Sequence, residues 1–326
     1  MQFYVNDSGT WKEVGSDAYY VKHSGAWRIV QEAYVKDAGS WKLYYQNEVG
    51  VTLANSTNVA VSSLFTSSIW TGTTPKRITI PSGVTIGGTG GTAAITIASN
   101  MAGTLIIDNA GSVLGTGGAS NGGAGGNAIT NAASNVTINN TNLLAGGGGG
   151  GNVGGTGGNG TTSSTTYYYN AANYDVWFWF DNNGEFFVYR SGTLIGKPTN
   201  FNTTTFGGYV KGPLQYSPGR DRYYSIGEVS TSNTSGGAGG AGGVGQGYNQ
   251  TNSSGSSGSA GGTNAGTGGS GSNGATYGQA AATGSTGANG NSTNGSAGAA
   301  GGAAGAAVSG TSVTMNNTGT VHGAVA

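Results

Sequence analysis

The segment VTMNNTGTVHG (313–323) decides how the chain must fold, because it repeats a pattern that occurs much earlier. It aligns without gaps with LIIDNAGSVLG (105–115) and VTINNTNLLAG (136–146). All three segments share apolar first, third and ninth residues, an Asp or Asn followed by Asn, and a final Gly. Such alternation predicts short strands with one buried face. We therefore expect the last strand, in 313–326, to return beside earlier strands, so that 147–312 is one long excursion.

The stretch that precedes the excursion has the same character. Short apolar alternations separated by Gly, Ser and Asn run through it, as in RITIPSGVTIG (77–87) and AAITIAS (93–99). Helix signals are absent. We predict that 51–146 forms a base of short β-strands, on which the closing strand 313–326 packs.

Glycines in the excursion recur at every third residue. One run is Gly148, Gly151, Gly154, Gly157 and Gly160, and further runs lie between 236 and 301. Extended helices of the polyproline II type have three residues per turn, so these glycines would form a bare backbone stripe on each helix. The pattern favours a bundle of polyglycine II-type helices over 147–312, with turns where the phase breaks. The alternative is a flexible Gly/Ser linker, against which the period and the returning strand argue.

An aromatic insertion interrupts the Gly-rich runs at 161–233. It contains YYYNAANYDVWFWFDNNGEFFVYRSGTLIG (167–196), in which DNNG is a hairpin signal between two aromatic strands. Strand alternation places Trp177 and Trp179 on one face. Two interpretations stay open: a small β-subdomain with an aromatic core, or exposed aromatic rings that stack on sugars.

Two more tyrosines lie where the glycine phase breaks, in YNQTNSS (248–254) and ATYGQAAAT (275–283). This placement favours loop tips over helix packing. Our candidates for a receptor surface in the bundle are therefore Tyr248, Asn249, Gln250 and Tyr277, and those in the insertion are Trp177 and Trp179.

The first 50 residues repeat one motif three times, as YVNDSGTWKEV (4–14), YVKHSGAWRIV (20–30) and YVKDAGSWKLY (34–44). Each copy predicts a hairpin, with a glycine at the turn and a tryptophan on the second strand. Trp11, Trp27 and Trp41 either form the core of a small β-domain or dock on another protein. We assign 1–50 to a three-hairpin attachment module.

Composition excludes several classes of function. Only 7% of the 326 residues are charged, 68 are Gly, and none is Cys. Nucleic acid is an unsuitable partner because clustered Lys and Arg are missing. Two histidines far apart and no cysteines predict neither a metal site nor a cofactor. The start of the chain has no secretory signal pattern, and no apolar run is long enough for a membrane span. Sparse carboxylates predict no catalytic residues, so we expect no enzyme.

One stretch carries a family resemblance. The segment GGAGGNAITNAASNVTINNTNLLAGGGGGG (122–151), the later Gly-rich runs and the terminal GTVHGAVA (319–326) resemble the distal tail-fibre adhesins of T-even-type bacteriophages, over roughly 100–326. The resemblance implies a sandwich of polyglycine II helices on short β segments, with loops that contact a receptor on the bacterial surface. The repeats in 1–50 depart from that family and are similar to repeats of other phage virion proteins.

These observations lead to a mostly-β, Gly-rich virion protein with essentially no α-helix. We expect a receptor-recognising adhesin at a tail-fibre tip, attached to another tail or fibre protein through 1–50, and present as a single copy or a homotrimer. One alternative is a purely structural tail, baseplate or capsid protein. Another is a non-viral binding protein built on a polyglycine bundle, against which the Trp repeats argue.

Overall fold

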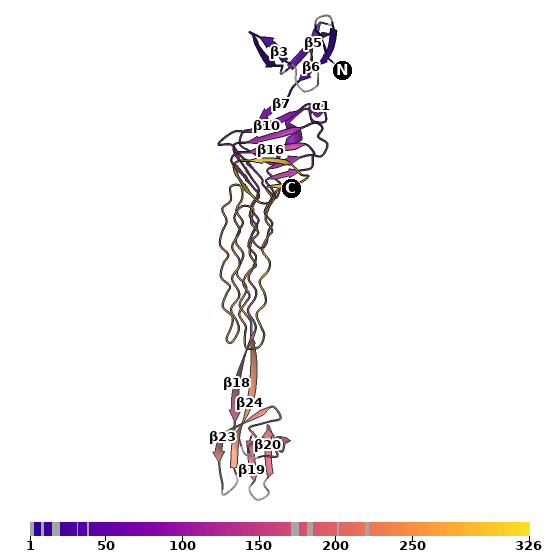
Figure 1. The fold of residues 1–326 in the computed structure, drawn as a ribbon. Helices are drawn as coiled ribbons and strands as arrows, with labels where there is room; N and C mark the ends of the chain where they lie inside the picture. Colours follow the sequence, from indigo (N-terminus) through magenta and orange to yellow (C-terminus); the bar gives the residue numbers. More distant parts are fainter. Residues whose placement is uncertain are drawn as a thin grey trace.

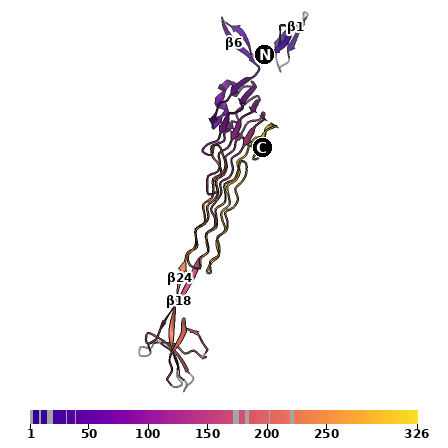
Figure 2. The same ribbon diagram turned by 90° about the vertical axis from the view of Figure 1, so that its left-hand side faces the viewer.

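The computed structural model of the chain describes residues 3–7, 10–14, 20–30, 32–37, 39–170, 176–180, 185–200, 202–218 and 222–326. The described residues are mostly extended, and their helices are a single 3-10 turn, η1 (Val61–Leu64), and a single α turn, α1 (Ser67–Trp70). The predicted mostly-β fold is therefore confirmed. The molecule is elongated, with the N-terminal strands at one end and β18–β24 at the other (Figures 1 and 2).

Three two-stranded antiparallel sheets form the N-terminal end. They pair β1 (Phe3–Asp7) with β2 (Thr10–Val14), β3 (Tyr20–His23) with β4 (Ala26–Ile29), and β5 (Glu32–Asp37) with β6 (Ser40–Gln46). The register repeats, because the tryptophans lie opposite Asn6, Lys22 and Lys36, the same position in each copy. Gly25 and Gly39 have φ of 81° and 85°, which explains the glycine at these turns.

A parallel β-helix with three faces follows the hairpins. The chain passes from one sheet to the next and then returns one level further along. Its first face contains β7 (Val49–Thr52), β10 (Lys76–Ile80), β13 (Leu105–Asn109), β16 (Val136–Asn140) and β26 (Thr314–Asn317). Its second contains β8 (Ser56–Thr57), β11 (Thr85–Gly87), β14 (Ser112–Leu114), β17 (Leu143–Ala145) and β27 (Thr320–His322). Its third contains β9 (Val59–Ala60), β12 (Ile95–Ile97), β15 (Ile129–Asn131) and β25 (Val308–Gly310).

Alternate residues of these strands fill the core of the β-helix. In β10, β13 and β16 the first, third and fifth residues are buried and the other two are partly exposed. The third residues of these strands, Ile78, Ile107 and Ile138, form one column that Met315 of β26 continues, because neighbouring strands pair in parallel register. Each fully buried aliphatic side chain contributes about 1.5–3 kcal/mol. The β-helix is the main hydrophobic core of the described residues.

Asparagines replace aliphatic residues in the fifth column. The Nδ2 of Asn109 donates to the Oδ1 of Asn140, and the Nδ2 of Asn140 donates to the Oδ1 of Asn317, both at 2.7 Å. Outside the core, Asp108, Asn139 and Asn316 form a parallel row of hydrogen bonds that continues to Arg77. These ladders join successive levels, so the terminal strand β26 is held by side chains as well as by its backbone.

The Gly-rich excursion leaves the β-helix between β17 and β25, which belong to the same level. Residues 146–159, here called the central segment, run away from the β-helix with neighbours on several sides. Its amide groups bond with a period of three: the N–H groups of Gly148, Gly151, Gly154 and Gly157 donate to the carbonyls of Gln246, Gly243, Gly240 and Gly237 at 2.8–2.9 Å. A second stripe of carbonyls, on Gly149, Asn152, Gly155 and Gly158, accepts from Ala275, Ser272, Gly269 and Gly266.

A third stripe of the central segment faces the last Gly-rich run. The carbonyls of Gly147, Gly150, Val153 and Thr156 accept from Gly305, Gly302, Ala299 and Ser296 at 2.8–3.0 Å. Where backbones face each other directly there is no room for a side chain, since a Cβ on Gly154 would lie 2.0 Å from the Gly269 oxygen. The glycines are therefore required by the close approach of neighbouring backbones.

Candidate functional site

The end of the molecule farthest from the hairpins is a sheet inserted into the Gly-rich bundle, here called the distal sheet (residues 160–234). Two long strands, β18 (Gly160–Tyr168) and β24 (Arg222–Thr234), pair antiparallel and connect it to the bundle (Figure 1). Its other strands are β19 (Val176–Phe180), β20 (Glu185–Arg190), β21 (Thr193–Gly196), β22 (Thr205–Phe206) and β23 (Tyr209–Tyr216). Their order is β21-β20-β19-β24-β23-β22, with β18 also paired to β24.

Asparagines anchor the distal sheet where it emerges from the bundle. The Nδ2 groups of Asn264 and Asn291 both donate to the carbonyl of Thr161 at 3.0 Å. The backbone N–H of Thr161 in turn donates to the Oδ1 of Asn291 at 2.7 Å. On the other strand, the Oγ1 of Thr234 donates to the carbonyl of Thr263 at 2.6 Å. The turns at the far end of the bundle therefore hold the base of the β18–β24 ribbon.

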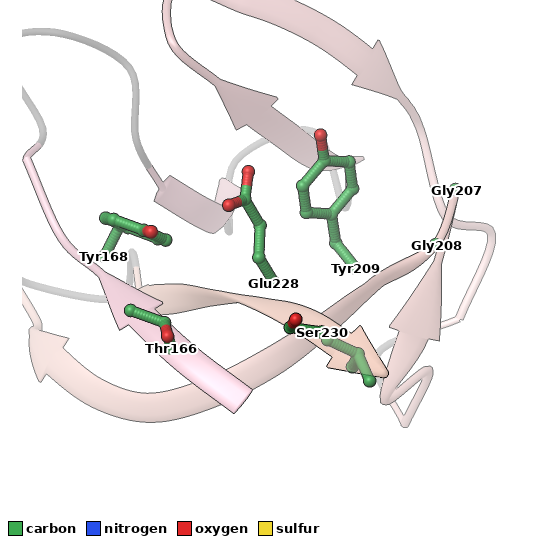
Figure 3. Close-up of a pocket in the computed structure, with 8 residues that line it drawn as sticks. Thr166, Tyr168, Gly207, Gly208, Tyr209, Glu228 and Ser230 are labelled. Carbon is green, nitrogen blue, oxygen red and sulfur yellow. The ribbon is translucent and has the colours of Figure 1, made fainter. Parts of the chain in front are cut away.

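A pocket of about 500 Å³ opens on one face of this sheet. Thr166, Glu228 and Tyr209 lie side by side across β18, β24 and β23, since Glu228 is the register partner of both others. Tyr168 and Ser230 are two residues further along their strands and so share that face. Figure 3 shows the Glu228 carboxylate between the rings of Tyr168 and Tyr209, with Gly207 and Gly208 at the rim.

An ion pair organises the pocket. The Nε of Arg190 donates to the Oε1 of Glu228 at 2.7 Å, and the Arg190 guanidinium lies 3.7 Å from the centre of the Tyr168 ring. The Arg190 side chain is only 15% exposed, whereas that of Glu228 is 40% exposed. A guanidinium over an aromatic face is attracted by the ring quadrupole. Arg190 thus fixes both the carboxylate and the tyrosine, and nearly cancels the local charge.

A small core supports the pocket. Val188 and Ile226 are fully buried, and Tyr168, Tyr209 and Phe206 pack against them. On the neighbouring strand the Lys211 ammonium lies 5.2 Å from the Tyr224 ring, and burial lowers the pKa of this lysine. Because Tyr168 and Tyr209 pack against this core and also line the pocket, each ring is partly fixed in the core and partly at the surface.

The tryptophans that we selected in this insertion lie on β19. Trp177 is opposite Val188 and Tyr224, and Trp179 is opposite Phe186 and Arg222, so both are in the middle of the sheet. Their side chains, and the predicted DNNG turn at 181–184, lie outside the described residues. The receptor role of these two tryptophans stays a prediction.

The structure places the candidate tyrosines of the bundle at its other end, next to the β-helix. The N–H of Tyr248 donates to the carbonyl of Gly115 at 3.0 Å, and a Cβ on Gly87 would overlap the Tyr248 ring. Both tyrosines lie in turns, as expected, but these turns lie against the β-helix, and the receptor role of the four candidates in them stays a prediction. Tyr248 is half-buried on β11, because Gly87 leaves space for its ring.

Tyr277 has a similar environment. Its hydroxyl donates to the carbonyl of Gly247 at 3.2 Å, and its ring stacks on His322 with 6.4 Å between centroids. Burial raises the pKa of this phenol. Of the two remaining candidates in this turn, Asn249 is exposed with φ of 52°, and the Nε2 of Gln250 donates to the carbonyl of Gly245 at 2.9 Å.

At the opposite end of the molecule, one repeat tryptophan can be placed in full. The Trp41 side chain is 68% exposed, and the Lys36 ammonium lies 6.0 Å from its ring. Trp41 is therefore not a core residue. The side chains of Trp11 and Trp27 lie outside the described residues, and their docking role stays a prediction.

No sequence pattern singles out the pocket residues Thr166, Tyr168, Tyr209 and Glu228. The sequence holds a weak signal, a run of threonines and tyrosines at 165–169 and a late acidic residue at 228. The pocket arises only when three strands that are distant in the chain pair side by side.

The described residues contain no group of three or more His, Cys, Asp or Glu side chains placed to hold a metal ion. Within the same ranges, no helix is long and apolar enough to cross a membrane. The chemistry available in the pocket is hydrogen bonding by hydroxyls and a carboxylate beside aromatic surfaces. This arrangement is suited to binding.

Comparison with known proteins identifies a family. A family model described as phage tail fibre adhesin Gp38 matches residues 48–219, more than half of the chain. The matched region begins just before β7 and ends in the distal sheet. Neither a curated protein nor a solved structure matches the chain.

Proposed function

Since the chain belongs to the phage tail fibre adhesin family Gp38, we propose that it recognises the host receptor with its distal sheet and docks on the fibre with its N-terminal hairpins. In this proposal the β-helix and the Gly-rich bundle separate the two functions. The protein acts by binding, without catalysis, and works in the virion at the tip of a tail fibre.

The distribution of exposed apolar side chains carries the proposal. Among the described residues, ten large hydrophobic side chains are strongly exposed. Six of them are in the distal sheet and two, Tyr34 and Trp41, are on the third hairpin. Exposed apolar groups that gather in one region are typical of interaction sites. These two regions are the two ends of the molecule in Figure 1.

We further infer that the Gly-rich segments are polyglycine II helices. Their backbone hydrogen bonds between neighbours recur every three residues, as expected for a helix with three residues per turn. A bundle of this kind is built from backbone hydrogen bonds instead of a hydrophobic core. Such a bundle needs few apolar residues, and it separates the distal sheet from the β-helix.

The turn residues of the bundle take different roles in this proposal. Tyr248 and Tyr277 hold the bundle on the β-helix, since both pack inward there. Trp177 and Trp179 belong to the distal sheet and remain candidates for the receptor surface. Trp11, Trp27 and Trp41 are the candidates for docking on the fibre.

A competition experiment tests the proposed function. The purified full chain is added to host cells before the phage, and free phage are counted after adsorption. We expect saturable binding of the chain and a dose-dependent loss of adsorption. A folded chain that neither binds the cells nor slows adsorption would instead support a purely structural role in the tail.

A further inference from the structure

We propose that the pocket of the distal sheet binds a neutral saccharide of the bacterial surface, so that the receptor read at this site is a glycan. The inference rests on the proposed function and names the class of ligand for the same end of the molecule. It is drawn from the kinds of groups that meet in the pocket and from their order across three strands.

The pocket combines the two kinds of surface that a sugar ring needs. A pyranose has an apolar face of C–H groups and a rim of hydroxyls that both donate and accept hydrogen bonds. Tyr168 and Tyr209 offer aromatic surface with a polar hydroxyl at one end. Between them the Glu228 carboxylate accepts hydrogen bonds, and the Thr166 and Ser230 hydroxyls can donate or accept (Figure 3).

The Glu228 carboxylate is held in place before any ligand binds, which supports a role in binding. A carboxylate has about four acceptor positions, so it can accept from sugar hydroxyls while it is held by the Nε of Arg190 at 2.7 Å. Arg190 also covers one face of the Tyr168 ring at 3.7 Å, which fixes the orientation of that ring. A ligand therefore meets groups that are already ordered, which reduces the entropy lost on binding.

Charge and size narrow the choice of ligand. Glu228 is the charged residue among those that line the pocket, and Arg190 behind it offsets its charge, so the lining offers no positive group to an anionic sugar. Its volume of about 500 Å³ lies within the range of roughly 300–1,000 Å³ that is typical of small-molecule sites. Gly207 and Gly208, with φ of 55° and 85°, form the tight turn at the rim and leave it without side chains.

Saturation-transfer NMR on the full chain tests the inference directly. The probes are the methyl glycosides of glucose, galactose, mannose and N-acetylglucosamine, and neutral polysaccharide released from the host surface. We expect transfer from the protein to at least one probe. Glu228→Gln should lower the affinity at least tenfold, because it breaks the pair with Arg190 and removes the charged acceptor.

Matched controls separate the pocket from the rest of the sheet. Glu185→Gln removes a carboxylate of similar exposure that pairs with Lys197, and it should leave saccharide binding unchanged. Ser230→Trp should fill the pocket and abolish binding, whereas Thr231→Trp, on the opposite face of β24, should not. Thermal melting of all four variants shows whether each is folded.

Binding to whole cells distinguishes failure of this inference from failure of the proposed function. Periodate treatment of the cells, which cleaves vicinal diols of sugars, should remove binding of the wild-type chain. Binding that survives periodate but is lost after protease treatment would overturn the glycan and leave the adhesin intact. No binding to untreated cells would overturn the proposed function itself.

Discussion

Gly160 and Thr234 lie opposite each other as the first pair of the β18–β24 ribbon, although the whole distal sheet separates them along the chain. The turns of the bundle hold both strands at this point. Thr161, next to Gly160, donates to Asn291, and Thr234 donates to the carbonyl of Thr263. The distal sheet is therefore attached to the bundle by one ribbon. This makes it separable in an experiment from the bundle that presents it.

The close approach of backbones in the bundle predicts a high cost for Gly154→Ala. The new Cβ would lie 2.0 Å from the Gly269 carbonyl oxygen, so the two segments would have to separate and lose hydrogen bonds. We expect the free energy of unfolding to fall by about 1–3 kcal/mol. Thermal melting measures the change, with the exposed neighbour in Val153→Ala as the control. Equal melting temperatures for both variants would argue against tight backbone packing.

The buried asparagine column predicts a second effect on stability. Asn140 is fully buried, accepts from Asn109 and donates to Asn317. Asn140→Ala leaves buried amide groups without partners and should cost about 2–4 kcal/mol. Asn139→Ala removes a member of the partly exposed outer row and should cost less than about 1 kcal/mol. Chemical denaturation measures the free energy of unfolding of both variants. A larger decrease for Asn139→Ala than for Asn140→Ala would refute this role of the buried column.

The raised pKa of the Tyr277 phenol predicts that the protein loses stability at alkaline pH. Burial raises its pKa above the ordinary value near 10, so on raising the pH the unfolded chain loses this proton first. Stability from this group is complete below about pH 10 and falls as the pH rises towards the pKa of the folded state. Tyr277→Phe should melt slightly lower at pH 8, having lost the bond to Gly247, but should fall less between pH 9 and pH 11. Parallel pH profiles for the two proteins would refute the assignment.

The exposed Trp41 predicts a defect in assembly without a defect in folding. Trp41→Ala removes an apolar ring that is 68% exposed, so the free energy of unfolding should change by less than about 0.5 kcal/mol. The amount of the chain in purified virions should fall strongly, because hot-spot residues in interfaces are commonly Trp. Immunoblots of virions give the measurement, and Ser56→Ala in the β-helix is the control. Normal incorporation of the Trp41 variant would remove this residue from the docking surface.

Part of the β-helix could be predicted because its levels reuse equivalent residues. The alignment of 105–115, 136–146 and 313–323 has the same register as the strands, with Thr137 opposite Thr314 and Leu143 opposite Thr320. The third face could not be predicted, since β25 is a short Val-Ser-Gly strand without a pattern of its own. It pairs with β15, and the Gly-rich excursion already ends there.

The candidate site was harder to predict for a topological reason. Glycine phase breaks indicate turns, but the sequence does not say whether a turn faces the β-helix or the far end of the bundle. Tyr248 was therefore selected for its place in a turn, whereas its ring occupies the space that Gly87 leaves beside the β-helix. Glu228 and its neighbours Thr166 and Tyr209 come from three strands whose pairing leaves no local signal.

Removal of the distal sheet tests whether this sheet contains the receptor site. Residues 161–233 are replaced by a short Asn-Gly turn between Gly160 and Thr234, which lie side by side in the ribbon. Host-cell binding of this chain is compared with that of the full chain, and melting of the bundle confirms that it is folded. We expect the shortened chain to stay folded and to bind cells no longer. Undiminished binding by the shortened chain would place the receptor site in the bundle or the β-helix instead.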